Sequence, residues 1–172
     1  MDVSVVMPVY NEREALRESL GRVLETGIPG EVIIVDDGSV DGTRDVLKDI
    51  EQSHRDACVL KVVYQPKNQG KGAAVRRGFQ EASKSILIIQ DADLEYNPSE
   101  YMTLITPILE GKADVVYGSR FLGGPHRVLY FWHSLGNKFL TLLSNMFTNV
   151  SLSDMETGYK ALRNGAYYEA PD

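Results

Sequence analysis

Glu31-Val32-Ile33-Ile34-Val35-Asp36 is the stretch of the chain that points most directly to a fold. Its central residues are all apolar, without the alternation of a half-exposed strand, which is typical of a strand covered on both faces. Other short apolar segments of the chain are expected to form strands as well. These are Val3–Pro8, Cys58–Gln65, Ser85–Gln90 and Ala113–Tyr117.

Segments with a helical spacing of apolar residues separate these strands. We expect helices over residues 12–26, 41–54, 73–83 and from Asn97 onward, and Asn11 with Glu14 has the pattern of a capping box at the first of them. Alternating strands and helices predict an α/β fold, with a mostly parallel sheet and helices on both faces. Ligands of such sheets bind at the carboxyl ends of the strands. The residues that directly follow each strand are therefore the first candidates for function.

The composition narrows the class of protein. The 172 residues carry a net charge of -6, which disfavours general nucleic-acid binding, because such binding needs a cationic face. Cys58 is the single cysteine, which excludes an intramolecular disulfide and a cysteine-cluster zinc site. No apolar run approaches the ~20 residues of a membrane-spanning helix, and no signal peptide is visible before Val3. We expect one cytoplasmic domain over residues 1–172.

Asp91-Ala92-Asp93 directly follows the apolar run of residues 86–89. Two carboxylates at this place cost desolvation free energy unless something compensates their charge. Mg²⁺ or Mn²⁺ would do so, because these ions bind carboxylate and phosphate oxygens, and Glu95 could add a further oxygen. A solvated strand end that caps the next helix explains the same residues without a metal, and both interpretations stay open here.

Asp36-Asp37-Gly38-Ser39 is a second acidic strand end. Asp37 could accept hydrogen bonds from a ribose or from a base N–H, as acidic residues do in nucleotide-binding folds. An ordinary Asp-Gly turn accounts for the segment without any ligand. Two acidic ends in one parallel sheet would nevertheless repel each other unless a cation or a ligand lay between them.

Several further residues carry weaker signals. Gly70-Lys71-Gly72 lacks the spacing of a phosphate-binding loop, so we assign its glycines to close packing at a helix start and Lys71 to contact with an anion. Arg120 is either a diphosphate contact or a surface arginine. Asp154 is either a base or acceptor-site residue, or a turn cap. Residues 127–150 have the pattern of an amphipathic helix that is too polar to span a bilayer.

In this order, the motifs resemble a family 2 inverting glycosyltransferase with the GT-A fold. The motifs are Met7-Pro8-Val9-Tyr10-Asn11-Glu12, Val35-Asp36-Asp37-Gly38-Ser39-Val40-Asp41-Gly42-Thr43, Asn68-Gln69-Gly70-Lys71-Gly72 and Asp91-Ala92-Asp93-Leu94. The run from Asn68 to Val75, together with Asp154-x-x-x-Gly158-Tyr159-Lys160, is similar to the branch that transfers a sugar to dolichyl or other polyprenyl phosphate.

The resemblance implies a role for each matching position. Residues that would hold the base and ribose are Pro8, Tyr10, Glu12 and Asp37. Residues that would line the sugar-nucleotide pocket are Lys71, Asp91 and Ala92. Asp93 would bind the Mg²⁺ or Mn²⁺ at the diphosphate, with Glu95 as a second ligand. Arg120 would contact the diphosphate or the acceptor phosphate, and Asp154 would lie on the acceptor side as a base or an orienting group.

The implied reaction moves a sugar from a nucleotide-diphosphate donor to a lipid phosphate. UDP-glucose and GDP-mannose both fit, with a UDP-sugar preferred, and the segment from Arg127 would rest peripherally against the cytoplasmic face of a membrane. The chain has no Gln-x-x-Arg-Trp motif, which disfavours processive polysaccharide synthesis. Relatives continue beyond Asp172, so we expect the catalytic domain to be incomplete at its C-terminus.

Two other functions stay open. The first is nucleotidyl transfer, which would make the sugar nucleotide instead of consuming it. Against it, Pro8-Val9-Tyr10-Asn11-Glu12 stands where a Gly-rich Arg/Lys signature is expected after the first strand. The second is binding of a nucleotide sugar without catalysis.

Overall fold

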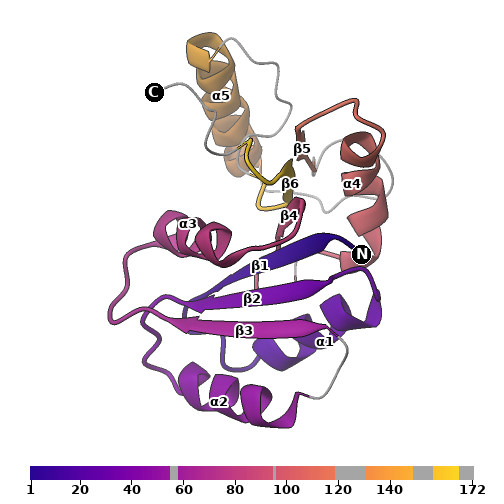
Figure 1. Cartoon of the computed structure of the whole chain (residues 1–172). Coiled ribbons are helices and arrows are strands. Elements are labelled where there is room, and N and C mark those ends of the chain that lie inside the picture. Colours follow the sequence, from indigo (N-terminus) through magenta and orange to yellow (C-terminus); the bar gives the residue numbers. More distant parts are fainter. Residues whose placement is uncertain (55–57, 95, 119–130, 149–156, 167–172) are drawn as a thin grey trace.

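The computed structural model of the chain describes residues 1–54, 58–94, 96–118, 131–148 and 157–166. Strands and helices alternate along most of this length (Figure 1). The elements are β1 (Val3–Val9), α1 (Leu16–Glu25), β2 (Glu31–Asp36), α2 (Thr43–Ser53), β3 (Val59–Tyr64), α3 (Lys71–Glu81), β4 (Ile86–Ile89), a 3₁₀ turn (Pro98–Glu100), α4 (Tyr101–Leu109), β5 (Val115–Tyr117), α5 (Phe131–Thr148) and β6 (Lys160–Arg163).

The strands form one sheet in the order β3-β2-β1-β4-β6-β5. Neighbours among β1, β2, β3 and β4 are parallel, whereas β6 runs antiparallel to both β4 and β5. The predicted mostly parallel sheet is therefore confirmed. The crossover from β3 back to β4, on the other side of β1, leaves the carboxyl ends of β1 and β4 next to each other, which is where open α/β sheets bind ligands.

Helices cover both faces of the sheet, as predicted (Figure 1). Alternate residues of β1 show this, because Val5 and Met7 belong to a hydrophobic cluster with α1, α2 and α4, while Val6 belongs to a second cluster with α3. Every residue of β2 is buried, which explains why its sequence lacks polar alternation.

Three sequence expectations need correction. The first helix begins at Leu16, and Asn11 does not cap it, because the Asn11 side chain is used in a contact between loops. No strand was expected after residue 117, but Lys160–Arg163 forms β6, a short strand whose four residues carry no strong β signal. The strand expected from Ala113 begins at Val115 and pairs with β6.

Glu31, at the start of β2, joins neighbouring segments at the amino ends of the parallel strands. It is fully buried, and its Oε1 accepts hydrogen bonds from Ser4 Oγ at 2.5 Å and from the backbone N–H of Ser83 at 2.6 Å. Lys61 Nζ lies 3.5 Å from its Oε2. Burial raises the pKa of Glu31, but these hydrogen bonds and the lysine outweigh that effect, so its pKa is lowered overall.

We expect Glu31→Gln to lower the free energy of unfolding by about 1–3 kcal/mol, since one buried charged acceptor serves several donors. The pKa of Glu31 is lowered in the folded protein. The difference in unfolding free energy between the wild type and the variant is therefore complete above the ordinary pKa of 4.5, and it is lost as the pH falls through the folded pKa. Urea unfolding of both proteins between pH 3 and 7 measures this. An equal difference at every pH would contradict it.

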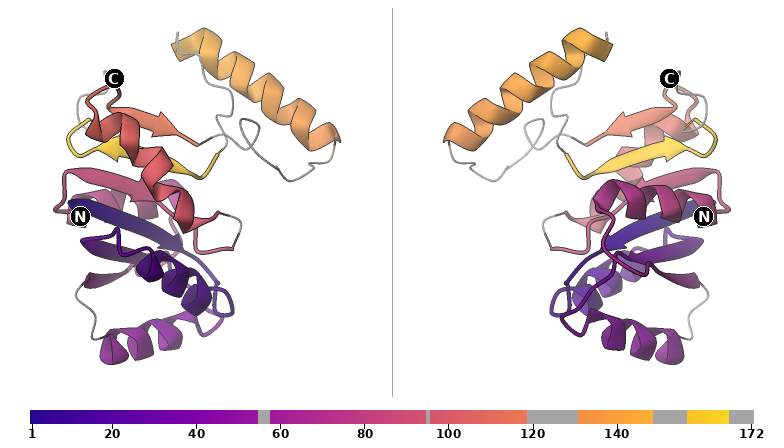
Figure 2. Two further views of the ribbon diagram at one scale, coloured as in Figure 1. Left: turned by 90° about the vertical axis from the view of Figure 1, so that its right-hand side faces the viewer. Right: turned by 90° about the vertical axis from the view of Figure 1, so that its left-hand side faces the viewer.

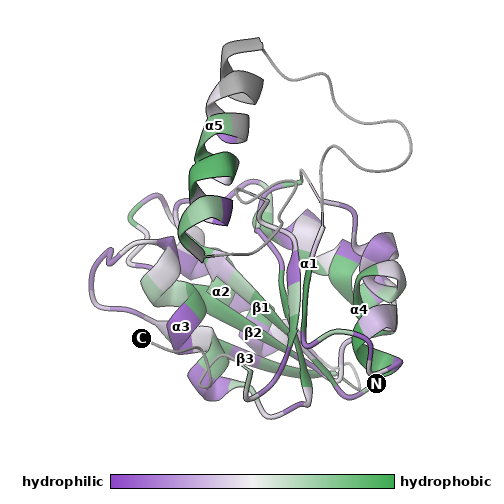
Figure 3. Ribbon diagram, turned by 90° about the horizontal axis from the view of Figure 1, so that it is seen from above, coloured by the Kyte–Doolittle hydropathy of each residue, from purple (hydrophilic) through white to green (hydrophobic). Residues whose placement is uncertain are grey.

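Helix α5 stands away from the sheet in both side views (Figures 1 and 2). It carries exposed Phe139, Leu142, Met146 and Phe147, and much of its coloured length is hydrophobic (Figure 3). Within the described ranges, no helix has the length and hydropathy needed to cross a membrane.

Candidate active site

A pocket of about 270 Å³ lies at the carboxyl ends of β1, β2 and β4, beside the start of α3. Every described residue that was predicted for the nucleotide sugar or the metal lines it. These residues are Pro8, Tyr10, Glu12, Asp37, Lys71, Asp91, Ala92 and Asp93. Glu95, Arg120 and Asp154, the other predicted site residues, lie outside the described residues. Sequence reasoning did not single out Asn68 and Ala74 as site residues, although both line the same pocket.

The loop after β1 is held by the loop after β2. The backbone N–H of Asn11 donates to Ser39 Oγ at 2.9 Å, and Asn11 Oδ1 accepts from the N–H of Val40 at 2.9 Å. The N–H of Glu12 donates to Thr43 Oγ1 at 3.0 Å. Asn11 has a φ of 55°, a left-handed conformation that asparagine tolerates better than most residues. These bonds fix Tyr10 and Glu12 at the mouth of the pocket.

Asp37 ties the second strand end to the start of α3. Its carboxylate is buried, with Oδ1 accepting the N–H of Gln69 and Oδ2 the N–H of Gly70, both at 2.8 Å. At Gly38, with a φ of 77°, a Cβ would lie 2.5 Å from the backbone nitrogen of Asn68, so only glycine permits this approach. A carboxylate has about four lone-pair sites, so Asp37 can still accept from a ligand in the pocket.

The neighbouring Asp36 has a structural role. Its carboxylate is fully buried. Oδ2 accepts a hydrogen bond from Arg44 Nε at 2.7 Å, and Oδ1 accepts one from the backbone N–H of Ser39 at 3.2 Å. Arg44 also donates to the backbone carbonyl of Gln65. Asp36 therefore braces the strand ends without lining the pocket, whereas Asp37 both links β2 to the start of α3 and lines the pocket.

Asp91 forms an ion pair with Lys71, and both residues line the pocket. Lys71 Nζ lies 2.6 Å from Oδ1 and 2.7 Å from Oδ2 of Asp91. The anion that Lys71 contacts is thus a carboxylate of the site itself. Both residues line the pocket and leave its volume open.

Negative charge gathers on the side of Glu12 and Asp93. Burial raises the pKa of Glu12 first, and the charges of Asp93, Asp41 and Asp91 raise it further. Within the described residues, no three His, Cys, Asp or Glu side chains are grouped to hold a metal ion by themselves. Carboxylates plus diphosphate oxygens and water are nevertheless the donor set of Mg²⁺ and Mn²⁺, and a cation would relieve this charge crowding.

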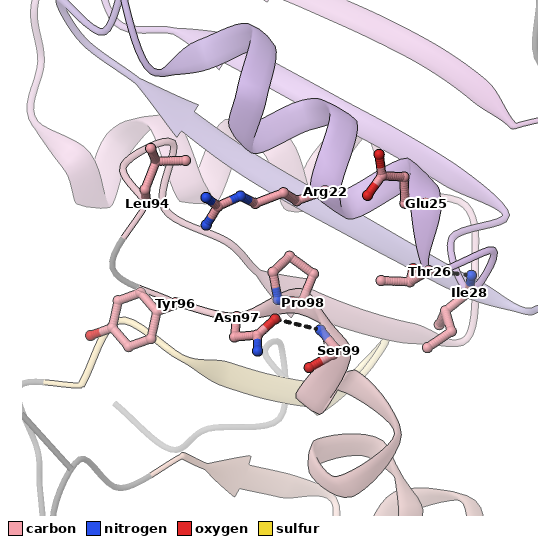
Figure 4. A pocket seen from close by; sticks show the side chains of 9 residues that line it. All are labelled: Arg22, Glu25, Thr26, Ile28, Leu94, Tyr96, Asn97, Pro98 and Ser99. Atoms are coloured by element: carbon pink, nitrogen blue, oxygen red, sulfur yellow. Dashed lines mark hydrogen bonds between the residues drawn. The ribbon is translucent and has the colours of Figure 1, made fainter. Parts of the chain in front are cut away.

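A larger cavity, of about 650 Å³, lies elsewhere, between the end of α1 and residues 94–99 (Figure 4). None of the predicted site residues that the structure describes lines it. Two of its polar side chains already have partners, since Arg22 pairs with Glu18 at 2.5 Å and Asn97 Oδ1 accepts the N–H of Ser99 at 3.1 Å. The smaller pocket is therefore the candidate active site.

Comparison with known proteins identifies the family to which the chain is similar. Residues 4–169 match the family described as Glycosyl transferase family 2. A dolichol-phosphate mannosyltransferase of Pyrococcus furiosus is 37% identical over 126 residues, which are 72% of this chain and 34% of that protein. A polyprenol monophosphomannose synthase of Mycolicibacterium smegmatis is 32% identical over 92% of this chain and 60% of that protein. The chain thus spans between a third and three fifths of the length of these relatives.

One solved structure with a similar fold is the mannosyltransferase PcManGT from Pyrobaculum calidifontis, in complex with GDP-Man and Mn²⁺. The TM-score is 0.60 at 26% sequence identity, over 66% of this chain and 34% of that one. The chain therefore resembles this structure in the arrangement of the sheet and its helices.

Proposed function

The chain belongs to glycosyl transferase family 2, and from that premise we propose that it transfers a sugar from a nucleotide-diphosphate donor to a polyprenyl or dolichyl phosphate. One observation carries the proposal: eight residues from four separate sequence segments converge on one pocket at the carboxyl edge of the sheet. Against nucleotidyl transfer, Pro8-Val9-Tyr10-Asn11-Glu12 contributes to this pocket where a Gly-rich Arg/Lys signature would be expected. The two relatives described above are named for mannosyl transfer, which favours GDP-mannose over the UDP-sugar preferred from the sequence. Other relatives are named for transfer of a 4-deoxy-4-formamido-L-arabinose group, so the assay below includes both donors.

In the proposed complex, the pocket divides into two parts. Pro8, Tyr10, Glu12 and Asp37 hold the base and ribose, and the fixed loops after β1 and β2 keep these groups in place. Lys71, Asp91 and Ala92 face the sugar. Asp93, with Glu95, is the place for a divalent cation, which when bound would offset the negative charge of the diphosphate. We assign Arg120 to the diphosphate or acceptor phosphate and Asp154 to the acceptor side.

The reaction is an in-line displacement with inversion. An oxygen of the acceptor phosphate forms a bond to the anomeric carbon, while the bond from that carbon to the donor diphosphate breaks and the nucleoside diphosphate leaves with the electron pair. A phosphate monoester has a second pKa of ~6, so the attacking oxygen is already anionic near neutral pH. A strong base is then unnecessary, and Asp154 orients the acceptor.

Helix α5 is the proposed contact with the membrane that holds the lipid acceptor. Its exposed Phe139, Leu142 and Met146 give one element several large apolar side chains that the described part of the fold leaves in solvent. An amphipathic helix of this kind gains free energy by burying its apolar face at the lipid interface.

We expect the double variant Leu142→Asp/Met146→Asp to bind vesicles of anionic phospholipid at least tenfold more weakly, since two charges would enter the interface. Its affinity for a nucleoside diphosphate should equal that of the wild type. The control Asn145→Asp adds a charge to a less exposed polar position of α5. Sedimentation with vesicles gives the result, and equal sedimentation of all three proteins would exclude the helix as a membrane contact.

A transfer assay tests the proposed function and its alternatives together. The protein is incubated with a labelled GDP-mannose or UDP-glucose, a polyprenyl phosphate in detergent, and Mn²⁺ or Mg²⁺. Formation of the lipid-linked sugar phosphate with release of nucleoside diphosphate is the expected result. Sugar nucleotide formed from a sugar phosphate and a nucleoside triphosphate, with pyrophosphate released, would establish nucleotidyl transfer instead. Nucleotide-sugar binding without any product would leave a binding function.

A further inference from the structure

Gly158 lies directly against the carboxylate of Asp91. A Cβ built on Gly158 would be 2.2 Å from Asp91 Oδ2 and 3.1 Å from a ring carbon of Tyr96. Both distances are shorter than ordinary van der Waals contacts, so any side chain at this position would displace the carboxylate or the segment itself. Gly158 stands two residues before β6, whose antiparallel pairing with β4 brings it to the end of that strand.

Tyr96 and its neighbours hold Gly158 in this place. The backbone N–H of Gly158 donates to Tyr96 Oη at 2.8 Å. Tyr159 is 4% exposed, and the centroid of its ring lies 5.1 Å from the centroid of the Tyr96 ring. Its hydroxyl donates a hydrogen bond to the backbone carbonyl of Asn97 at 2.8 Å. The segment before β6 is thus fastened to the segment after β4 by two hydrogen bonds and a ring contact.

Asp91 is held from both sides. Lys71 attracts the carboxylate from the start of α3, with Nζ 2.6 Å from Oδ1, while the backbone of Gly158 lies on the side of Oδ2. A carboxylate attracted by an ammonium group alone could turn about its bonds. The close packing against Gly158 restricts that rotation, because Tyr96 keeps Gly158 from moving away.

We infer that Gly158 and Tyr96 are positioning residues that set the orientation of Asp91 in the donor pocket. The inference rests on the proposed function, because it assigns to Asp91 a contact with the nucleotide sugar. It gives a physical role to the glycine of Asp154-x-x-x-Gly158-Tyr159-Lys160, which the donor-site residues do not explain. The same contact joins the segment that follows Asp154 in the chain to the donor side of the site.

A double-mutant cycle on the affinity for the nucleotide sugar tests this inference. Calorimetry with GDP-mannose and UDP-glucose, each with Mn²⁺, is applied to the wild type, Gly158→Ala, Asp91→Ala and the double variant. We expect Gly158→Ala to weaken binding about tenfold in the wild-type background and less than twofold in the Asp91→Ala background, because its effect acts through that carboxylate. Gly21→Ala is the matched control, since nothing lies within 4 Å of a Cβ at Gly21.

Tyr96→Phe provides a second route, because it removes the oxygen that accepts the Gly158 N–H and keeps the ring. We expect the same non-additivity with Asp91→Ala, whereas Tyr64→Phe, which loses a hydroxyl bond to Glu51 away from the pocket, should bind as the wild type does. Equal losses in both Asp91 backgrounds, or no loss in either variant, would overturn the inference. If the wild type binds neither nucleotide sugar, the proposed function fails. The positioning contact is then tested separately, because additive losses of unfolding free energy for Gly158→Ala and Asp91→Ala would overturn it.

Discussion

Asp93→Ala is expected to reduce sugar transfer at least about 10²- to 10³-fold while the protein stays folded, because it removes the carboxylate assigned to the cation at the leaving diphosphate. Asp93 follows the strand end of β4 and lines the donor pocket, and its charge contributes to the raised pKa of Glu12. Initial rates with saturating donor and acceptor, at several Mn²⁺ concentrations, measure the effect. Circular dichroism confirms the fold.

The control is Asp45→Ala, which removes a carboxylate that is 84% exposed on α2. It should transfer sugar at the wild-type rate. Loss of Asp93 also removes repulsion from Glu12, so the pKa of Glu12 should fall toward its ordinary value. If Asp93→Ala retains turnover with an unchanged Mn²⁺ dependence, the role assigned to Asp93 is wrong.

Asp37→Asn is expected to weaken nucleotide binding by one to two orders of magnitude and to destabilise the fold by about 1–3 kcal/mol. The carboxylate accepts one backbone N–H with each oxygen, from Gln69 and from Gly70. The amide of asparagine keeps one acceptor and turns an NH₂ group toward the other N–H, which then has no acceptor. Calorimetric titration with a nucleoside diphosphate and urea unfolding measure the two effects.

Asp45→Asn serves as the matched control for affinity, which should stay within error of the wild type. Because Asp45 is an exposed carboxylate in the first turn of α2, its loss should cost only a few tenths of a kcal/mol of stability. A variant of Asp37 that binds nucleotide as tightly as the wild type would show that the link between β2 and the start of α3 does not shape the pocket.

The strand ends were predictable because burial leaves a direct mark on the sequence. The apolar run of β2 and that before Asp91 located two strands of a parallel sheet, and topology then requires their carboxyl ends to share an edge. That reasoning correctly gathered Asp37, Asp91 and Asp93 in one pocket. The resemblance to a known family added the donor roles, which remain predictions.

What the sequence could not provide depends on contacts between distant segments. Asn11 has the spacing of a helix cap, yet its side chain bonds to Val40, because the loop after β2 lies closer than the helix end. β6 escaped notice since its four residues gain their strand conformation from pairing with β4 and β5. The pairing of Lys71 with Asp91 and the contact of Gly158 with the same carboxylate likewise have no local signature.

The central claim is that the pocket between Asp37 and Asp93 binds the diphosphate of a sugar nucleotide together with a divalent cation. Calorimetric titration of the wild-type protein with GDP-mannose and UDP-glucose, in Mn²⁺ and then in EDTA, tests it most directly. We expect saturable one-to-one binding of at least one donor, which weakens at least tenfold when the metal is removed and by one to two orders of magnitude in Asp37→Asn. Absence of binding for both donors, or binding that neither the metal nor that substitution changes, would contradict it.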